Sequence, residues 1–359
     1  MFYQRMVRPI LFLIDPEKIH NFTLWGLSFF SKSKTLNKIL KSALDYTSPV
    51  LSQKLFSLYF KNPIGLAAGL DKNGQAINTW SAMGFSWAEI GSITYQEQSG
   101  NPKPRLWRLP QDKGLVVYYG LCNKGAKKIV EQLKKKTGII SASIAKSNAV
   151  AMEQAADDYQ ASFDLLSEYA DIITINLSCP NVKNFSGLQS KILLEPILDR
   201  VQSINIQQKP IWLKIGQDLL KEEIDDIIYL AKKYQISAII ACNLAKERSV
   251  LNLKSKHKDK PGGVSGQALT DRVDKIIAYL YKNSEGKYKI IGTGGVFSGY
   301  DAYKKIKAGA NLVQLITGLI YNGPKAINII NKQLENLLKQ DNFKNISEAV
   351  GIESDQYIL

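Results

Sequence analysis

Cysteine and histidine are scarce in this chain of 359 residues, which contains three cysteines and two histidines. The cysteines, Cys122, Cys179 and Cys242, form no CxxC pair, and together with His20 and His257 they are too few to favour a metal or iron–sulfur site. The same count argues against a disulfide framework. We therefore expect a reducing compartment and no bound metal.

Long apolar runs are also missing. No segment reaches the roughly 18 consecutive apolar residues that a membrane span requires. The N-terminal ILFLI is short, is followed by DPEK and has no small-residue cleavage site. We therefore expect neither a signal peptide nor a transmembrane helix.

Negative charge is in deficit, because 47 Lys and Arg against 32 Asp and Glu give a net charge of +15. A positive field favours anionic partners such as nucleic acid, acidic lipid or an acidic small substrate. The lysines are scattered, as in LKKKTG and LKSKHKDKPGG, and are not interleaved with aromatic residues. They indicate a solvated surface, and without a nucleic-acid reading motif we expect no nucleic-acid partner.

Residues 1–45 differ from the rest of the chain. Both FYQRMVRPILFLI and IHNFTLWGLSFFSKSKTLNKILKSAL show large apolar residues at helical spacing, with basic residues between them. Two interpretations are open at this point. The segment packs wholly on the main domain, or it forms a pair of amphipathic helices on an anionic membrane surface.

From about residue 60 onward, short β-rich apolar runs alternate with helical patterns such as LKEEIDDIIYLAKKYQ and LTDRVDKIIAYLYKNS. This rhythm predicts an α/β fold, a (β/α)₈ barrel over residues 46–340, followed by a C-terminal tail at 341–359. A doubly wound sheet is the alternative, but it usually has fewer strands. The eight runs span residues 63–69, 87–93, 138–145, 171–178, 210–216, 237–243, 289–295 and 312–318.

The ends of these runs are where a barrel places its chemistry. Loops after the last two strands often bind phosphate through backbone N–H groups, which suits the endings GTGG and ITG. The pattern predicts a phosphorylated cofactor across the barrel mouth, with Lys214 beside a ring atom that gains negative charge on reduction. The residues that predict this site are Gly69, Lys72, Asn176, Cys179, Asn181, Lys214, Asn243, Gly266, Gly294, Gly295, Thr317 and Gly318.

Cys179 stands in the stretch NLSCPN, at the end of the fourth run. A free cysteine usually packs as a small buried hydrophobic residue. Its place between two asparagines, at the same barrel end as Lys72, instead favours a group that takes or gives a proton.

The motifs NPIGLAAGLDKNG, EIGSIT, GNPKPRLWRL, NLSCPN, LKIG, GGVSGQAL, IIGTGGVFSG and LVQLITGLIYNGP run from one end of the chain to the other. In them the chain resembles the dihydroorotate dehydrogenases, FMN enzymes on a (β/α)₈ barrel. The segment RPILFLIDPEKIHNFTL looks like the extension of the membrane-associated, quinone-dependent class, in which a helical pair docks on the membrane and admits quinone to the flavin.

The resemblance implies oxidation of (S)-dihydroorotate to orotate in UMP biosynthesis, by a peripheral protein on the cytoplasmic face of the membrane. Quinone as the electron acceptor rests on the N-terminal segment alone, and fumarate or a nicotinamide partner protein are the alternatives.

The resemblance also implies roles for individual residues. Cys179 is the base that removes a proton from C5 of the dihydropyrimidine while a hydride leaves C6 for the flavin, and Lys72 is its neighbouring charge. FMN contacts are implied for Ala67, Ala68, Gly69, Lys72, Ser92, Ser143, Asn176, Lys214, Cys242, Gly266, Gly294, Gly295, Ile316, Thr317 and Gly318. Substrate contacts are implied for Lys72, Tyr118, Tyr119, Gly120, Leu121, Asn176, Asn181, Asn243 and Leu244.

The catalytic positions depart from the quinone-dependent class. That class has serine where this chain has Cys179, and phenylalanine and threonine where it has Leu121 and Val182. The soluble class has the cysteine. Because a thiol ionises more readily than a hydroxyl, the cysteine is consistent with loss of the proton relay.

The substrate pocket departs from the family as well. The family has asparagine at the position of Val117, threonine or serine at Leu244, and asparagine at Ser143. Each pocket hydrogen bond that is lost costs roughly 1–3 kcal/mol. Either the pocket is rebuilt with Tyr118 and Tyr119, or the substrate is a less polar dihydropyrimidine-like compound or cyclic amide. A non-catalytic flavin scaffold is disfavoured, because the base and both lysines are retained.

Overall fold

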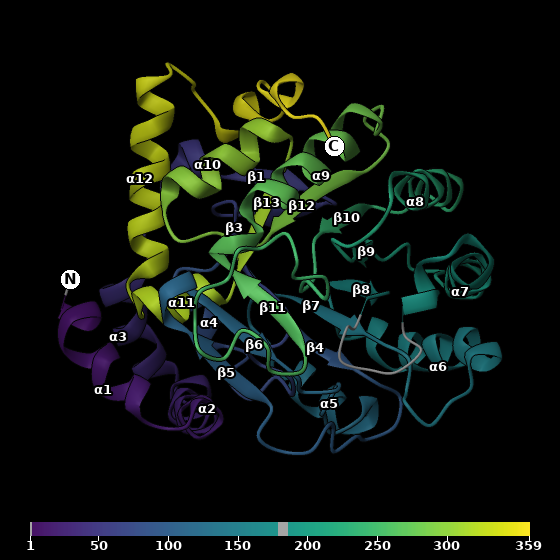
Figure 1. Ribbon diagram of the computed structural model, residues 1–359, viewed down its shortest axis with the longest axis horizontal. Coiled ribbons are helices and arrows are strands. Elements are labelled where there is room, and N and C mark those ends of the chain that lie inside the picture. The colour runs from purple at the N-terminus through teal and green to yellow at the C-terminus, as the bar shows by residue number, and fades with distance from the viewer. Residues whose placement is uncertain (1, 179–185) are drawn as a thin grey trace.

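The computed structural model describes residues 2–178 and 186–359 (Figure 1). At its centre lies a closed barrel of eight parallel strands, and all eight predicted runs form its strands. The prediction of a (β/α)₈ barrel is therefore confirmed. The strands are β3 (Ile64–Leu66), β4 (Trp87–Ile93), β7 (Ile139–Ile144), β8 (Ile172–Asn176), β9 (Ile211–Ile215), β10 (Ala238–Ala241), β12 (Lys289–Thr293) and β13 (Leu312–Leu315).

The strands are apolar on both faces because one face lines the barrel interior and the other lies under the helices. Every residue of β8 (IITIN) and of β9 (IWLKI) is buried. Strands in such a position show continuous β-branched runs instead of alternation. This is why short apolar runs, and not a period of two, marked them in the sequence.

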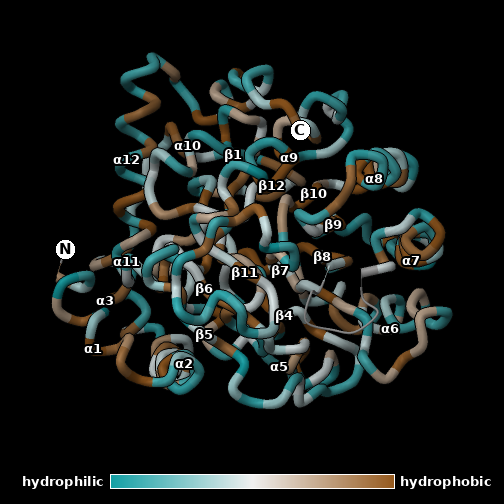
Figure 2. Tube along the Cα trace, viewed as in Figure 1, coloured by the Kyte–Doolittle hydropathy of each residue, from teal (hydrophilic) through white to brown (hydrophobic). Residues whose placement is uncertain are grey.

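Helices cover the outside of the barrel (Figure 1). The two predicted helical stretches quoted above form α8 (Lys221–Lys233) and α9 (Thr270–Lys282). Hydrophilic and hydrophobic residues are interspersed along these outer helices (Figure 2), and the buried positions of α8 and α9 are mostly apolar. The other helices of this layer are α4 (Thr79–Ala82), α5 (Ala126–Leu133), α6 (Ala155–Ser167), α7 (Lys191–Ser203), α10 (Gly299–Ala308), α11 (Thr317–Asn322) and α12 (Ala326–Gln340).

The hairpin of β1 (Gln53–Leu55) and β2 (Leu58–Phe60) closes the N-terminal end of the barrel. The Phe60 ring meets Trp87 edge-on, with ring centres 5.4 Å apart, and Trp87 meets Trp212 in the same way at 6.1 Å. A side chain at Gly65 would lie 2.2 Å from the Trp87 ring, so only glycine fits beside it. The opposite, C-terminal end is left for the site.

A small antiparallel sheet that we did not predict lies over the C-terminal end. It consists of β5 (Leu106–Leu109), β6 (Gly114–Val117) and β11 (Gly263–Gly266), with β6 in the middle. The motif GGVSGQAL thus supplies the strand β11. It pairs with β6 from a distant part of the chain, and local sequence carries no sign of that pairing.

The N-terminal arm, residues 2–44, is helical as predicted. It contains a π-helical turn (Tyr3–Val7), α1 (Arg8–Leu13), α2 (Pro16–Lys32) and α3 (Lys34–Leu44), and it lies beside α4, α11 and β5 (Figure 1). The second predicted helix divides in two at Ser33, whose backbone is extended and whose hydroxyl caps α3 by accepting from the Leu36 N–H.

No helix of residues 2–178 and 186–359 combines the length and apolar character needed to cross a membrane. Beyond α12, two short 3₁₀ turns, Ile346–Ala349 and Ser354–Gln356, end the chain.

Candidate active site at the barrel mouth

A cavity of about 1250 Å³, including the part open to solvent, lies between the C-terminal ends of the barrel strands and the small sheet. We call it the mouth cavity. Of the residues predicted for the site, it brings together Ala67, Ala68, Gly69, Lys72, Ser92, Tyr119, Gly120, Leu121, Asn176, Lys214, Cys242, Asn243, Leu244, Gly266, Gly294, Gly295, Ile316, Thr317 and Gly318.

Some predicted residues are placed elsewhere. Ser143 does not line the cavity, because it is fully buried behind Ser92 and its hydroxyl lies 2.8 Å from the Ser92 hydroxyl. Tyr118 also stands outside the wall, and its carbonyl accepts a hydrogen bond from Asn101. Cys179 and Asn181, together with Val182, lie outside the described residues.

The loops after β12 and β13 form one wall of the cavity. Gly294 and Gly295 have φ values of +122° and +73°, which favour glycine. A side chain at Gly318 would lie 2.0 Å from the Val296 carbonyl oxygen, so the two loops touch through bare backbone. The Thr317 hydroxyl faces them, 2.9 Å from Ser265. A wall of this kind brings backbone groups close to a phosphate.

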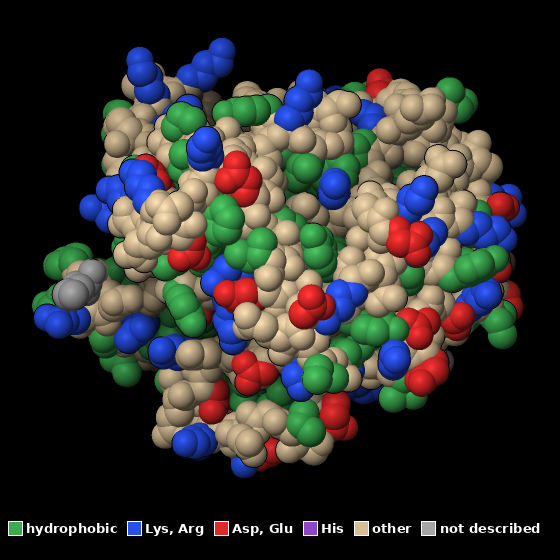
Figure 3. All heavy atoms as spheres, turned by 90° about the horizontal axis from the view of Figure 1, so that it is seen from above, with side chains coloured by type: hydrophobic (Ala, Val, Ile, Leu, Met, Phe, Trp, Pro, Cys, Tyr) green, Lys and Arg blue, Asp and Glu red, His purple; other side chains and the backbone are tan. Residues whose placement is uncertain are grey.

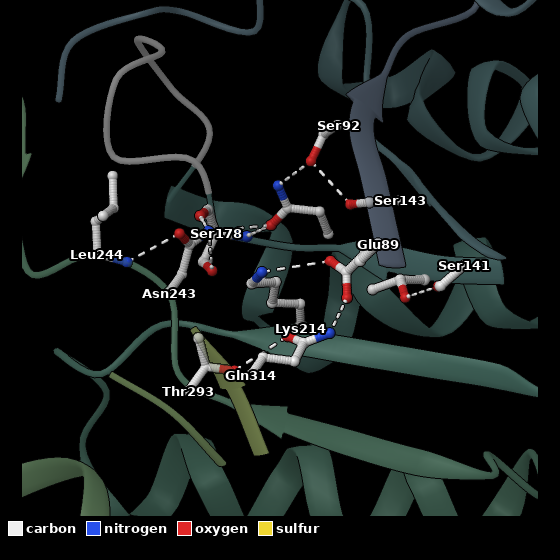
Figure 4. A network of polar contacts seen from close by, with 12 residues as sticks. Glu89, Ser92, Ser141, Ser143, Ser178, Lys214, Asn243, Leu244, Thr293 and Gln314 are labelled. Carbon is white, nitrogen blue, oxygen red and sulfur yellow. Dashed lines mark hydrogen bonds and ion pairs between the residues drawn. The ribbon is translucent and has the colours of Figure 1, made fainter. Parts of the chain in front are cut away.

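Asn176, at the end of β8, joins Ser92, Ser178 and Asn243 into one polar network, and Figure 4 labels these three partners. Its side-chain amide donates to the Ser92 hydroxyl at 2.8 Å, and its side-chain oxygen accepts from Asn243 at 3.2 Å. Asn243 in turn donates to the Ser178 carbonyl. These bonds fix two amide side chains at the cavity wall, and each polar atom of both amides has a partner in the chain.

Lys72 follows β3 and meets the N-terminal arm. Its ammonium lies 3.4 Å from His20 Nε2 on α2 and 3.8 Å from the centre of the Tyr119 ring. Burial lowers the pKa of Lys72 to about 8, although the neighbouring Cys122 raises it. Burial, and then the Lys72 charge, also hold the pKa of His20 well below its usual range.

Tyr119 carries a buried hydroxyl that has no hydrogen-bond partner within residues 2–178 and 186–359. Buried polar groups almost always have a partner. The oxygen has almost no exposed surface, so Tyr119 meets the mouth cavity through its ring, over which the Lys72 ammonium lies.

The other part of the cavity wall is apolar. This apolar part is formed by Leu106, Leu115 and Val117 of the small sheet, Ile320 of α11, and Leu244. Val117 and Leu244 are half-buried and present hydrocarbon where a polar side chain had been expected from the family pattern. The cavity thus has a polar end, deep in the barrel, and an apolar end at the small sheet and α11, while Lys72 places a charge where the arm meets it.

Sequence reasoning missed three residues of this site. Glu89 on β4 is fully buried, and its carboxylate lies 3.3 Å from the Lys214 ammonium. The side-chain amide of Gln314 on β13 donates to the same carboxylate at 2.7 Å. His20 was treated only as part of an amphipathic arm. The acid inside the strand WAEIGSI was the available signal, because a charged residue is almost never fully buried without a partner.

The low pKa of His20 gives a prediction about the docking of the arm. A histidine whose pKa is lowered in the folded state stabilises that state fully above about pH 6.5, and this contribution falls as the pH drops further. We expect the protection factors of the α2 amides, that is, their exchange rates corrected for the intrinsic pH dependence of exchange, to fall between pH 7.5 and 5.5. His20→Gln should remove this pH dependence, whereas His257→Gln should keep it. An equal pH dependence in both variants would contradict the assignment.

Known proteins are similar to this chain along nearly its whole length. The family model described as dihydroorotate dehydrogenase matches residues 50–338. A Nostoc punctiforme protein named dihydroorotate dehydrogenase (quinone) is 40% identical, over 98% of this chain and 98% of its own. A protein of the same name from Crocosphaera subtropica is 41% identical over 92% of this chain and 89% of its own.

Solved structures agree as well. The structure described as DHODH in complex with ferulenol from Eimeria tenella superimposes with a TM-score of 0.85 at 30% identity, over 94% of this chain and 96% of that one. The ligand-free form from the same organism matches equally well, over 99% of its chain.

Proposed function

We infer, from the premise that the chain belongs to the dihydroorotate dehydrogenase family, that the mouth cavity is where dihydroorotate is oxidised to orotate. The protein is an FMN-dependent oxidoreductase of pyrimidine biosynthesis with a quinone as electron acceptor, as the names of its full-length relatives indicate. These relatives give no support for a less polar substrate. The observation that carries the proposal is the gathering of two lysines and two asparagines in one cavity.

The cavity fits FMN. Its deep end offers the buried ammonium of Lys214 and the amide of Asn176, and its glycine-rich wall after β12 and β13 suits a phosphate. We propose that these residues hold the cofactor, together with the small residues Ala67, Ala68 and Gly69. When bound, FMN supplies the acceptor for the hydride that leaves C6 of the substrate.

The substrate is an anion with two ring amides and a carboxylate. We propose that Lys72 binds the carboxylate, since it is the cavity lysine at the outer end, and that Asn176 and Asn243 pair with the ring amides. Asn181 belongs to the same proposal from its place in NLSCPN.

We propose that Cys179 is the general base. It follows Ser178, whose carbonyl accepts from Asn243, so the chain leaves the described region at the cavity wall. Cys179 takes the proton from C5 as the hydride leaves C6, which accounts for both hydrogens lost in forming the ring double bond. A general base of this kind contributes about 10²–10⁴-fold to the rate.

We also propose that the arm lies on a membrane surface and admits quinone through the apolar end of the cavity. The solvent side of α2 exposes Phe22, Trp25 and Phe29 at 66%, 57% and 48%. Trp25 packs edge-on against Phe29, with ring centres 4.8 Å apart, so the three rings form one apolar patch. Apolar and basic side chains lie side by side at the edge of the molecule where the arm lies (Figure 3), a pattern typical of helices that bind anionic lipid.

The patch can be tested without deleting the arm, whose inner face helps to line the cavity. We expect the triple variant Phe22→Glu, Trp25→Glu, Phe29→Glu to lose binding to phosphatidylglycerol vesicles by roughly tenfold or more, because each aromatic side chain fully removed from water contributes about 1.5–3 kcal/mol. Flotation of protein with vesicles measures this.

The matched control replaces two isoleucines of the barrel with glutamate. Ile192 and Ile206 are 83% and 89% exposed, and their variants should bind vesicles as the unmodified protein does. If the triple variant still floats normally, the arm serves only to pack on the barrel. FMN content should be the same in every variant, because none of these side chains lines the mouth cavity.

A further inference from the structure

Glu89 is a carboxylate in the middle of a barrel strand, and its side chain has no exposed surface. It points into the barrel interior, beneath the deep end of the mouth cavity, but it does not line that cavity. Burying a carboxylate costs several kcal/mol unless it is paired and hydrogen-bonded. The contacts of Glu89 therefore indicate what stabilises its buried side chain.

Each oxygen of Glu89 has its own donor from another strand (Figure 4). Oε1 lies 3.3 Å from the Lys214 ammonium on β9, and Oε2 accepts from the Gln314 amide on β13 at 2.7 Å. The Gln314 side-chain oxygen accepts from the Thr293 hydroxyl on β12 at 3.1 Å. Four strands are thus joined across the barrel interior.

Lys214 stands between Glu89 and the cavity. Its ammonium has three donors, and the contact with Glu89 occupies one side of it while the residue also lines the cavity. Glu89 thus has no contact with a bound ligand and acts on it only through Lys214. It limits where the ammonium lies, and it offsets part of the positive charge that the ligand experiences.

We propose that Glu89 is a positioning residue that sets the charge Lys214 presents to FMN, and thereby lowers the reduction potential of the bound flavin. The inference rests on the proposed function, since it requires FMN at the deep end of the cavity. A nearby positive charge favours the reduced, more negative ring. A buried carboxylate behind that charge weakens this preference, and removing it should restore the preference.

The chain contains a second buried pair that serves as a control. Lys305 of α10 and Asp274 of α9 lie 2.6 Å apart, and both side chains are fully buried, but neither residue lines the mouth cavity. Breaking either pair leaves an unpaired buried charge and lowers stability. Only the pair that includes Lys214 should also change the flavin.

The experiment measures the midpoint potential of bound FMN by anaerobic equilibration with redox dyes. In Glu89→Gln, reduced FMN should bind at least about tenfold more tightly relative to oxidised FMN than in the unmodified protein. For a two-electron couple this is a shift of about 30 mV to more positive potential. Asp274→Asn should lower the melting temperature and leave the potential unchanged.

Two further variants distinguish a charge effect from a packing effect. The double variant Glu89→Gln, Gln314→Glu returns a carboxylate to the same network and should bring the potential back toward its original value. Gln314→Met removes the competing donor from Glu89, so the carboxylate compensates Lys214 more fully and the potential should become more negative. This variant keeps its carboxylate and provides the test if Glu89→Gln does not fold.

An unchanged or more negative potential in Glu89→Gln, with stability lowered as in Asp274→Asn, would show that the pair is only structural. An unchanged or more positive potential in Gln314→Met would overturn the proposal in the same way. If the unmodified protein binds no FMN, the proposed function itself is wrong, which is a separate result.

Discussion

Cys179→Ala is expected to lower the rate of flavin reduction by dihydroorotate about 10²–10⁴-fold, because the variant has no group to take the C5 proton. FMN binding should be retained, since the side chains proposed to hold the cofactor come from other positions. Stopped-flow absorbance of the flavin under anaerobic conditions measures the rate of this half-reaction directly. It does so without any contribution from the quinone.

Cys179→Ser distinguishes loss of a base from disruption of the loop. A hydroxyl ionises less readily than a thiol, and the chain has Leu121 and Val182 in place of the residues that assist the hydroxyl in the quinone-dependent class. We therefore expect Cys179→Ser to be slow at neutral pH and to recover part of its rate as the pH rises. If Cys122→Ala abolished reduction and Cys179→Ala did not, the base would have been misassigned.

Lys72→Met is expected to raise the KM for dihydroorotate by about 10–100-fold, because a hydrogen bond to a charged group contributes about 1.5–3 kcal/mol. Methionine nearly preserves the volume beside Tyr119 while removing the charge. Steady-state kinetics with a short-chain quinone give this KM. The KM for the quinone should change far less, since the apolar end of the cavity is untouched.

The pH dependence provides an independent test of Lys72. Its pKa of about 8 means that the side chain is charged below that pH and neutral above it. We expect kcat/KM for dihydroorotate in the unmodified protein to fall as the pH rises through about 8. This decrease should be missing in Lys72→Met. Lys124→Met removes an exposed lysine that lines the same surface hollow as Lys72. This variant should keep both the KM for dihydroorotate and the decrease in kcat/KM above about pH 8. If kcat/KM still decreased above about pH 8 in Lys72→Met, the decrease would come from another titratable group.

The barrel was predictable because each of its strands is a local signal. A run such as DIITINLS is apolar, β-branched and bounded by polar residues, and the barrel places it where such runs are stable. The small sheet of β5, β6 and β11 was not predicted. Its strands β5 and β6 are neighbours in the chain, but β11, which pairs with β6, comes from a distant segment.

The candidate site likewise contains contacts that the sequence predicts and contacts that it does not. Lys72, Asn176, Lys214 and Asn243 stand at strand ends, so the barrel geometry alone predicts that they meet. The contact between Glu89 and Lys214 joins residues 125 positions apart across the barrel interior, and no periodic pattern in the sequence predicts it. The position of Ser143 behind Ser92 likewise depends on which face of β7 turns inward, which the resemblance could not decide.

The most direct test of the central claim is the absorbance spectrum of the purified protein under anaerobic conditions, titrated with dihydroorotate and then with a quinone. We expect an oxidised flavin spectrum at the start, bleaching as dihydroorotate is added and recovery of the spectrum with the quinone. A flavin that stays oxidised at millimolar dihydroorotate would contradict it.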